Sequence, residues 1–397
     1  MAPHTTHHDV IVVGARVAGS STARLLATRG YDVALLERAI LPSDTLSTHA
    51  IARGGVVQLA RWGLLDKVLA TGAPAIREVA FWRAGEQRRV AVKDRAGVDL
   101  LLAPRRQVLD LLLAEEAVAA GAGLQTGTAV TGLLRDDRGR VTGVEAVTRC
   151  GHETRLHARF VVGADGLRSS TATRARARVR GSRPSRTSTW YAHVEGDWSG
   201  FEFHVGPQAF AGAFPTHDGQ ACVWLCRPTA LLEPVRTAGA GRRAAWADAL
   251  GAIAPALAGR ASAGHVASPV RGGVDLPDQV REPHGHGWAL VGDAGYHRDP
   301  ITGHGITDAF RDAELLADAI APVLAGEAGE APSLSAYAAA RDAALAETFR
   351  LTRALATFPN PTRFVELQME LSDALEREAS ELASRPAPAG LHAATAA

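Results

Sequence analysis

The sequence predicts an α/β protein in which a dinucleotide-binding unit lies next to a region of antiparallel strands. A strand, a glycine turn, a helix and a second strand follow one another within residues 9–37. A later apolar strand ends at Gly292-Asp293, and aromatic residues gather between residues 190 and 224. Apolar strands alternating with helices are typical of parallel sheets, whereas short strands between Pro/Gly turns are typical of antiparallel ones.

The chain has 397 residues, enough for two or three structural units. Its 43 basic and 42 acidic residues leave a formal charge of +1, which argues against a strongly basic nucleic-acid surface. We therefore expect a small-molecule partner and no nucleic acid. The start of the chain has no apolar signal region, and no run of 18 apolar residues occurs, so we expect no membrane span and a cytoplasmic location.

The three cysteines, Cys150, Cys222 and Cys226, are scattered. Cys222 and Cys226 are four apart in an apolar, strand-like stretch and are expected to share one face. No histidine or further cysteine lies beside them at metal-ligand spacing, so we expect small buried hydrophobes and no metal site.

The first motif runs from an apolar, β-branched strand into Gly14-Ala-Arg-Val-Ala-Gly19, and a second strand then ends at Glu37. We expect Gly14 to make the tight turn and Gly19 to let the helix pack closely on the strand. The helix start, at Val17 and Ala18, would offer free N–H groups to a pyrophosphate. Glu37, followed by Arg38, would accept hydrogen bonds from ribose hydroxyls.

One position departs from this fingerprint, because Arg16 stands where a middle glycine lets the backbone approach the pyrophosphate. Its side chain has to point away from the ligand or embrace it with its charge. The alternative interpretation is an ordinary βαβ unit without a dinucleotide.

Three further motifs follow in order. Pro104 and two arginines start a helix near residue 106, and a strand runs into the turn Asp165-Gly166. The last motif is Gly292-Asp293, followed by a loop that opens a helix at residue 306. An Asp at a strand end suits a polyol hydroxyl, and the positive end of a helix stabilises negative charge on a ring.

Together these motifs resemble those of FAD-dependent monooxygenases of the aromatic-hydroxylase type, whose relatives include geranylgeranyl reductases and flavin-dependent halogenases. The resemblance implies a Rossmann-like FAD-binding domain with an inserted antiparallel β-sheet substrate domain and C-terminal helices. It assigns Asp165-Gly166 to FAD and the nicotinamide cofactor, and Asp293 to the flavin ribityl chain. Arg106, or less readily Arg105, matches the basic residue near the FAD phosphates or ribityl.

The resemblance also implies the domain boundaries. The FAD-binding domain is expected to comprise residues 1–75, 100–180 and 275–325, and the substrate domain residues 76–99 and 181–274. C-terminal helices would cover 326–384, with two of them at roughly 333–357 and 361–384, and residues 385–397 would form a disordered tail.

Candidate catalytic residues lie in loops expected near the flavin. A histidine there takes or gives a proton at neutral pH, or shapes the loop through a backbone hydrogen bond. Arg53 would face the flavin or an anionic substrate, or else be solvated. The expected catalytic residues are His49, Arg53, His297 and Pro300. The expected cofactor-binding residues are Gly14, Arg16, Val17, Ala18, Gly19, Glu37, Arg38, Arg106, Asp165, Gly166, Gly292, Asp293, Gly303, His304, Gly305 and Ile306.

Eight of the 21 aromatic residues lie between Trp190 and Trp224, and they would form sheet core or line a substrate pocket. The eight are Trp190, Tyr191, Trp198, Phe201, Phe203, Phe210, Phe214 and Trp224.

The resemblance implies an enzyme of secondary metabolism that uses FAD, NADPH or NADH as a transient co-substrate, and O2. A flavin C4a-hydroperoxide would hydroxylate or epoxidise a hydrophobic, aromatic or polyketide-like molecule. A separate flavin reductase is a further candidate partner, and the oligomeric state is open. The alternative is a C=C reductase of the geranylgeranyl-reductase type. A halogenase is disfavoured because the sequence has no Trp-x-Trp motif and no convincing catalytic lysine.

Overall fold

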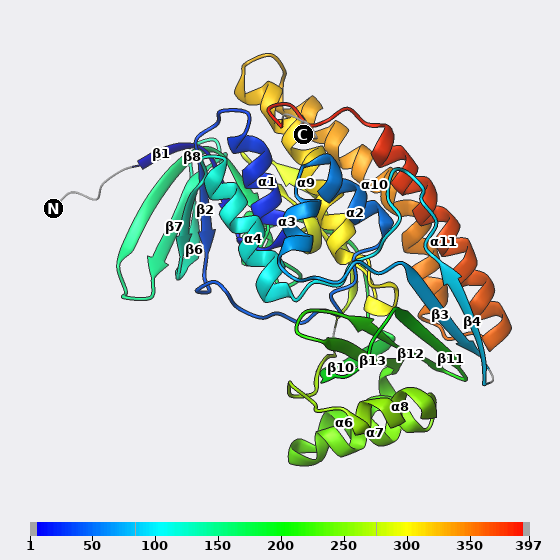
Figure 1. The fold of residues 1–397 in the computed structure, drawn as a ribbon. Coiled ribbons are helices and arrows are strands. Elements are labelled where there is room, and N and C mark those ends of the chain that lie inside the picture. Colours follow the sequence, from blue (N-terminus) through cyan, green and yellow to red (C-terminus); the bar gives the residue numbers. More distant parts are fainter. Residues whose placement is uncertain (1–5, 84, 275, 392–397) are drawn as a thin grey trace.

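The computed structural model describes residues 6–83, 85–274 and 276–391, which form two large sheets with helices packed between and around them (Figure 1). In the larger sheet the strand order is β16-β17-β8-β1-β2-β5, with β6 and β7 joined through β8. Its strands are β1 (Thr6–Val13), β2 (Val33–Glu37), β5 (Gly123–Thr126), β6 (Thr128–Arg135), β7 (Val141–Thr148), β8 (Glu153–Gly163), β16 (His284–Gly285) and β17 (Trp288–Leu290).

The centre of this sheet is parallel and buried on both faces. Strand β1 pairs in parallel with β2 and with β8, and β17 continues beyond β8. Successive side chains of a strand point to opposite faces. Val10 and Val12 accordingly pack into one core, and Ile11 and Val13 into another on the far face. This explains why the second half of β1, residues 10–13, is an uninterrupted apolar run in the sequence.

Helices cover one face of the sheet, and β6, β7 and a short helix cover the other. The long α9 packs against α1, and α1 also packs against α4, so the three bring their N-terminal ends toward the same region. These helices are α1 (Val17–Ala27), α2 (Arg53–Arg61), α3 (Leu65–Ala70), α4 (Arg106–Ala119), α5 (Ser170–Ala175) and α9 (Gly305–Leu324).

The second sheet has the order β14-β10-β13-β12-β11-β3-β4 and is antiparallel except where β11 pairs with β3. Segments far apart in sequence thus share one sheet, as the resemblance implied. Its strands are β3 (Glu78–Arg83), β4 (Glu86–Ala91), β10 (Thr187–Glu195), β11 (Phe201–Gly206), β12 (Ala209–Pro215), β13 (Gln220–Pro228) and β14 (Arg271–Gly273).

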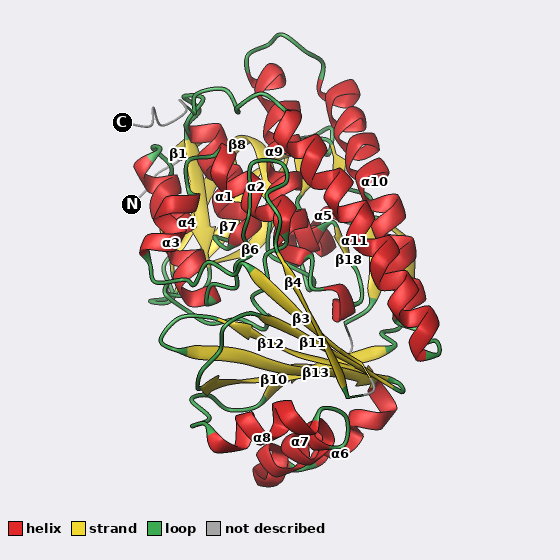
Figure 2. Cartoon of the chain, turned by 45° about the vertical axis from the view of Figure 1, so that its right-hand side comes forward, coloured by secondary structure: helices red, strands yellow, loops and turns green. Residues whose placement is uncertain are grey.

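Both faces of this second sheet are covered, as Figure 2 shows. One face packs on α10 (Glu330–Leu355) and α11 (Pro361–Ser384), and the other on α6 (Glu233–Thr237), α7 (Arg242–Gly251) and α8 (Pro255–Ala263). The 3₁₀ turns η1 (Thr229–Leu232) and η2 (Gly239–Gly241) flank α6. Three helices therefore lie within residues 181–274, the segment expected to belong to the β-sheet substrate domain.

The aromatic cluster is mainly core. Phe210 meets Phe364 of α11 with ring centroids 5.3 Å apart, and Phe201 and Phe214 lie 4.4 Å apart in the same core. Trp190 packs instead on the α7–α8 side. Cys222 and Cys226 are buried in the α11-facing core, so they share one face of β13 as expected.

A third, small sheet joins β9 (Val179–Arg183), β15 (Asp278–Arg281) and β18 (Tyr296–His297). The two expected C-terminal helices are present, within a few residues of the expected ends. The prediction of a disordered tail is wrong for residues 385–391. Leu391 packs against the apolar core between the parallel sheet and its helices, and Arg61 of α2 donates a hydrogen bond to the Pro386 carbonyl. This part of the tail therefore packs against the folded protein. Residues 392–397 lie outside the described part of the chain.

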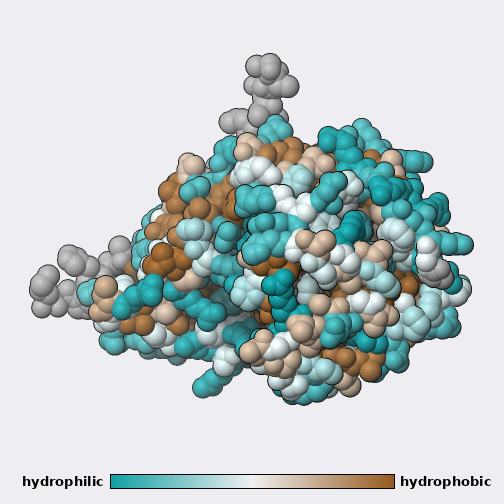
Figure 3. All heavy atoms as spheres, turned by 60° about the horizontal axis from the view of Figure 1, so that its bottom comes forward, coloured by the Kyte–Doolittle hydropathy of each residue, from teal (hydrophilic) through white to brown (hydrophobic). Residues whose placement is uncertain are grey.

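Apolar side chains are scattered among polar ones on the face that Figure 3 shows. Among the described residues, no helix combines the length and the apolar character that crossing a bilayer requires.

Candidate active site

A cavity of about 650 Å³ lies at the carboxyl edge of the parallel sheet, between that sheet and the second one. Its walls come from the turn after β1, the end of β2, the start of α4, the turn after β8 and the loop before α9. Ligands of open α/β sheets bind outside the carboxyl ends of the strands. The loop of residues 45–48 and strand β10 close the opposite side.

The turn after β1 has no room for side chains at its two glycines. Gly14 has φ +102°, and a Cβ there would lie 2.6 Å from the Ala164 carbonyl oxygen. A Cβ on Gly19 would lie 1.7 Å from the Gly14 carbonyl oxygen. Gly14, Val17 and Ala18 line the cavity, while Gly19 supports them from behind. The sequence-based interpretation of both glycines thus has a direct steric basis.

Glu37 ends β2 at the cavity wall, and Arg38 lies beside it. The two Glu37 carboxylate oxygens accept backbone hydrogen bonds from Ala15 and Ala39, each at 2.9 Å. A carboxylate oxygen has a second acceptor site. Glu37 therefore fixes the turn and retains capacity for ribose hydroxyls.

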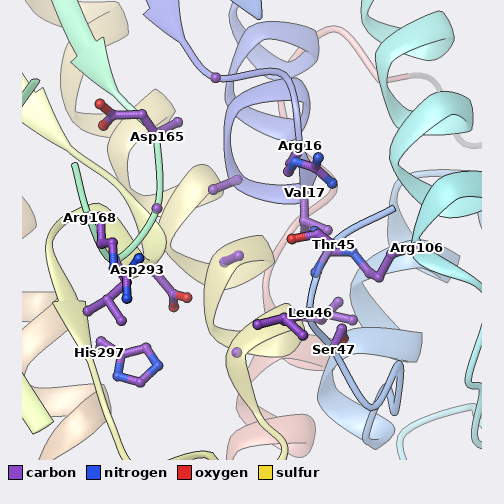
Figure 4. Close-up of a pocket in the computed structure, with 18 of the residues that line it drawn as sticks. Arg16, Val17, Thr45, Leu46, Ser47, Arg106, Asp165, Arg168, Asp293 and His297 are labelled. Carbon is purple, nitrogen blue, oxygen red and sulfur yellow. The ribbon is translucent and has the colours of Figure 1, made fainter. Parts of the chain in front are cut away.

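Arg16 is accommodated because its side chain turns toward α4. Its guanidinium donates to the buried Asp110 carboxylate at 2.9 Å and to Ser43 Oγ at 3.0 Å. Arg106 donates to the same carboxylate at 2.9 and 3.1 Å. Figure 4 shows Arg16, Thr45 and Arg106 on one side of the cavity. Two guanidinium groups held by one carboxylate leave a net positive charge at the cavity wall, which suits an anion.

Asp165 lies at the cavity but directs its carboxylate elsewhere. It accepts hydrogen bonds from Ser169 and Ser170 Oγ and from Thr171 N and Oγ1, which fixes the start of α5. Figure 4 shows the side chain pointing away from the arginines on the far wall. Asp165 therefore shapes the turn that carries Gly166 and Arg168, both of which line the cavity.

Asp293 presents an uncommitted carboxylate. It lies in the 3₁₀ turn η3 (Gly292–Ala294), lines the cavity and has no hydrogen-bond partner among the described residues. Desolvation raises the pKa of this carboxyl, against the opposing effect of the neighbouring His297. Gly292 itself is outside the cavity and has φ +58°. Because a Cβ there would lie 3.0 Å from the Ala18 Cβ, Gly292 permits the turn to approach α1.

The start of α9 closes the floor of the cavity. The turn η4 (Pro300–Thr302), Gly303, His304, Gly305 and Ile306 all contribute to its lining, except that Ile301 faces the core. The N–H groups of the first helical turn have no intrahelical partner and carry positive partial charge.

His304 is buried, and neither of its ring nitrogens has a hydrogen-bond partner in the described chain. The Thr307 hydroxyl, one turn further along α9, is also unpartnered. Burial, aided by the positive charge of Arg298, lowers the pKa of His304 to about 4, so the ring is neutral at pH 7. His304 lines the cavity whereas Thr307 faces α2, so the unpartnered ring nitrogens of His304 are the donor and acceptor expected where a polar ring docks.

The expected catalytic residues separate into two pairs. His297 and Pro300 line the cavity, and the Nδ1 of His297 lies 2.9 Å from the Pro277 carbonyl oxygen. The structure does not bring His49 and Arg53 into the cavity lining. Arg53 is held by Glu376 of α11 at 2.8 Å and by the Val98 carbonyl. Its position follows from that buried ion pair, which sequence spacing does not show.

Several cavity residues were missed by sequence reasoning. The eight clustered aromatics were expected to be core or pocket without distinction, and Tyr191 alone of them lines the cavity, beside Thr189 of the same strand. Arg298 also lines it, held by Asp308 and Thr348. The sequence held one signal for Arg298, because it lies between His297 and Pro300, which were both predicted to be catalytic. The loop lining comprises Thr45, Leu46, Ser47 and Thr48.

The sequence matches the family described as FAD binding domain over residues 7–352. The chain belongs to this FAD-binding family. Its glycine turns, the charged wall at Arg16 and Arg106, the free Asp293 carboxylate and the unpartnered His304 together fit FAD. The chain is accordingly an FAD-dependent oxidoreductase.

Curated relatives of this FAD-binding chain include digeranylgeranylglycerophospholipid reductases of archaea. Reductase 1 of Methanopyrus kandleri is 30% identical over 349 residues, covering 83% of each chain. The enzyme of Methanocella arvoryzae is 26% identical over 347 residues, covering 84% of this chain and 82% of that one.

Solved structures share the fold at lower identity. The flavin-dependent brominase Bmp2 has a TM-score of 0.80 and 21% identity, covering 98% of this chain and 96% of the other. PqsL, a probable FAD-dependent monooxygenase from Pseudomonas aeruginosa, has a TM-score of 0.76 and 23% identity, covering 92% of this chain and all of the other.

We predict that Arg106→Gln weakens FAD binding by about 10-fold or more, because a charge-assisted hydrogen bond contributes roughly 1.5–3 kcal/mol. Arg105→Gln is the matched control, since Arg105 adjoins Arg106 but does not line the cavity and donates to Gln220. The measurement is flavin fluorescence during titration of the apoprotein. Equal affinities of the two variants would contradict the assignment to Arg106.

We also predict that His304 makes the folded protein sensitive to acid. Between pH 6.5 and about 4, the unfolded chain binds a proton at His304 that the folded protein excludes. Stability therefore falls as the pH drops through this window, by at most about 1.4 kcal/mol per pH unit for this residue. Urea unfolding across the window should show a shallower pH dependence for His304→Gln. The exposed His286→Gln is the control, and an unchanged slope in His304→Gln would refute the prediction.

Proposed function

We propose that this FAD-dependent oxidoreductase is a monooxygenase that uses NADPH or NADH and O2 to hydroxylate or epoxidise a hydrophobic, ring-bearing small molecule. The observation that carries the proposal is the lining of the cavity on the substrate side. Hydroxyl-bearing side chains gather there, opposite His297, and they are Thr45, Ser47, Thr48, Thr189 and Tyr191.

Such a wall suits a compact ring with oxygen substituents. Polar groups buried against hydrocarbon would lose hydrogen bonds to water without replacement, which is costly. A long polyprenyl chain would instead need apolar walls along its length. Leu46 and Leu276 supply apolar contact area between the hydroxyls.

When bound, FAD would supply electron transfer from the nicotinamide donor and activation of O2. Arg16 and Arg106 would neutralise its phosphates, and Asp293 would accept hydrogen bonds from ribityl hydroxyls. The N-terminus of α9 would stabilise negative charge on the reduced ring, and His304 would contact a polar ring edge.

His297 is the proposed proton acceptor for a substrate hydroxyl. The Pro277 carbonyl can only accept, so the His297 Nδ1–H donates to it, and Nε2 is the ring nitrogen left for the cavity. Removing a proton from a phenolic hydroxyl increases the electron density of the ring that receives oxygen. Pro300 and the loop of residues 45–48 would help exclude water from the reaction.

The second candidate is a C=C reductase, favoured by the identity of the curated relatives, which are named as reductases of geranylgeranyl lipids. The two candidates differ in what the product gains. A monooxygenase adds one oxygen atom from O2, whereas a reductase adds two hydrogen atoms.

We predict that the FAD-loaded protein, given NADPH and a panel of phenols and polyketide-like rings under ¹⁸O₂, forms a product heavier by one ¹⁸O atom. Mass spectrometry of the products and the ratio of NADPH to O2 consumed are the measurements. A product heavier by two hydrogens, formed with polyprenyl substrates in the absence of O2, would overturn the proposal in favour of the reductase. Reduction only when a flavin reductase is added would assign the electron source to that partner.

We further predict that His297→Gln lowers kcat by about 100-fold, because general-base catalysis contributes on this scale, while FAD binding stays unchanged. His286→Gln, on an exposed histidine nearby in sequence, should retain activity. The measurement is kcat at saturating substrate, with the FAD content of each variant as the check on folding. A kcat equal to that of the wild type would exclude His297 as the base.

A further inference from the structure

Two histidines and a cysteine from distant parts of the chain meet behind the cavity wall. His49 ends the loop that lines the cavity, His193 lies in β10, and Cys222 lies opposite His193 in the register of β13. All three side chains are almost fully buried. Their ligating atoms, one from each residue, lie within 4.8 Å of one another. His217, five residues before Cys222, is not part of this cluster, and His49 and His193 reach Cys222 only through the loop and the sheet register.

The two imidazoles face each other through their Nε2 atoms, 2.9 Å apart. Burial lowers the pKa of His49 well below its usual value and the pKa of His193 to about 4, so both rings are neutral at pH 7. Neutral imidazole and thiolate are the forms that bind transition metals. Without a cation between them, the two rings have to share one proton.

The supporting contacts orient the rings. The Nδ1 of His193 lies 3.2 Å from Ser268 Oγ, and this second hydrogen bond directs Nε2 toward His49. His49 has φ +68°, an unfavourable conformation for a residue with a side chain, and its buried Nδ1 has no partner. Such local strain is found preferentially at functional sites. The Tyr191 ring lies nearly perpendicular to both imidazoles, with ring centroids 6.2 Å from His49 and 5.8 Å from His193.

The charged groups that act on the two imidazoles are net positive, because Arg105, Arg106 and Arg271 face one carboxylate, that of Asp44. Arg105 disfavours an additional cation, but it lies 4.0 Å from Asp44, whose carboxylate also accepts from Arg271 at 2.7 Å. A divalent cation with one thiolate would add a single positive charge to this network.

We propose that His49 Nε2, His193 Nε2 and Cys222 Sγ bind one zinc ion. Imidazole and thiolate favour zinc over magnesium or calcium, which prefer oxygen ligands. Tetrahedral zinc at 2.0–2.1 Å from nitrogen and 2.3 Å from sulfur separates its nitrogen ligands by about 3.3 Å and nitrogen from sulfur by about 3.6 Å. The two Nε2 atoms, now 2.9 Å apart, would have to separate by about 0.4 Å, and a water molecule would supply the fourth ligand.

Binding replaces the thiol proton of Cys222 with the metal and releases that proton to solvent. A cysteine thiol is protonated at pH 7, so about one proton is released per zinc bound. The ion would fasten the loop of residues 45–48 to the second sheet and thereby fix one wall of the substrate cavity. This inference is independent of the reaction proposed above.

The experiment uses the FAD-loaded protein with its full chain. Zinc is titrated in competition with a chromophoric chelator, and the amount of bound metal is measured by elemental mass spectrometry. Cobalt is then substituted, because tetrahedral cobalt with a thiolate ligand absorbs at wavelengths longer than those of oxidised flavin. We expect one equivalent of metal, release of one proton, and the cobalt–thiolate spectrum.

Two variants and a matched control locate the ion. Cys222→Ser and His193→Gln should lower zinc affinity by at least about 10-fold, the usual effect of losing a ligand or its support. Cys226→Ser changes the other buried cysteine on the same face of β13 and should retain zinc. The FAD content of each variant reports on folding.

If the wild-type protein does not bind one equivalent of zinc with high affinity, the proposal is wrong, whatever the variants show. Equal zinc retention in Cys222→Ser and Cys226→Ser would overturn it as well. The cluster would then be a pair of hydrogen-bonded histidines beside a buried thiol.

Discussion

The site depends first on how closely α1 packs against the turn after β1. Gly14 lies against the carbonyl of Ala164 after β8, and Gly19 lies against the carbonyl of Gly14. At both positions a Cβ atom would overlap the neighbouring carbonyl oxygen, so only glycine fits. Since β1 and β8 are parallel neighbours, their turns and the N-terminus of α1 converge on one edge of the sheet. A side chain at either glycine would displace α1 and open the cavity.

A second constraint is electrostatic. Buried charges have to be paired, and removing one partner costs about 3–5 kcal/mol. Arg298 connects the cavity lining to Asp308 of α9 and to Thr348 of α10, and Arg311 of α9 reaches Glu378 of α11 at 2.7 Å. The C-terminal helices thus hold the start of α9 in place, although they lie far from it in sequence.

The substrate side is built differently. The aromatic side chains of the second sheet mostly pack against its covering helices, so they stabilise the sheet and leave the cavity to smaller hydroxyl-bearing residues. Asp44 links the cavity loop to β14 through Arg271. The loop between β2 and α2 is therefore positioned by contacts with the second sheet.

The sequence by itself determined the side of the cavity that the parallel sheet and its turns form. Gly14, Glu37, Asp293 and the start of α9 were identifiable because each is fixed by local backbone geometry or by its place at a strand end. The spacing of strand, turn and helix then brings these positions to one edge, whatever the rest of the chain does.

Tertiary structure decided the remainder. Arg16 turns toward α4 at the cavity wall because the Asp110 carboxylate, 94 residues later, accepts its hydrogen bond, and Arg53 is held by Glu376 instead of facing the cavity. His49 meets His193 only because β10 and the loop pack together. Sequence spacing gives the face of a helix or strand on which a side chain lies. Packing between elements distant in sequence decides which group that side chain contacts. That selection depends on sheet register and buried charge, which only the folded chain establishes.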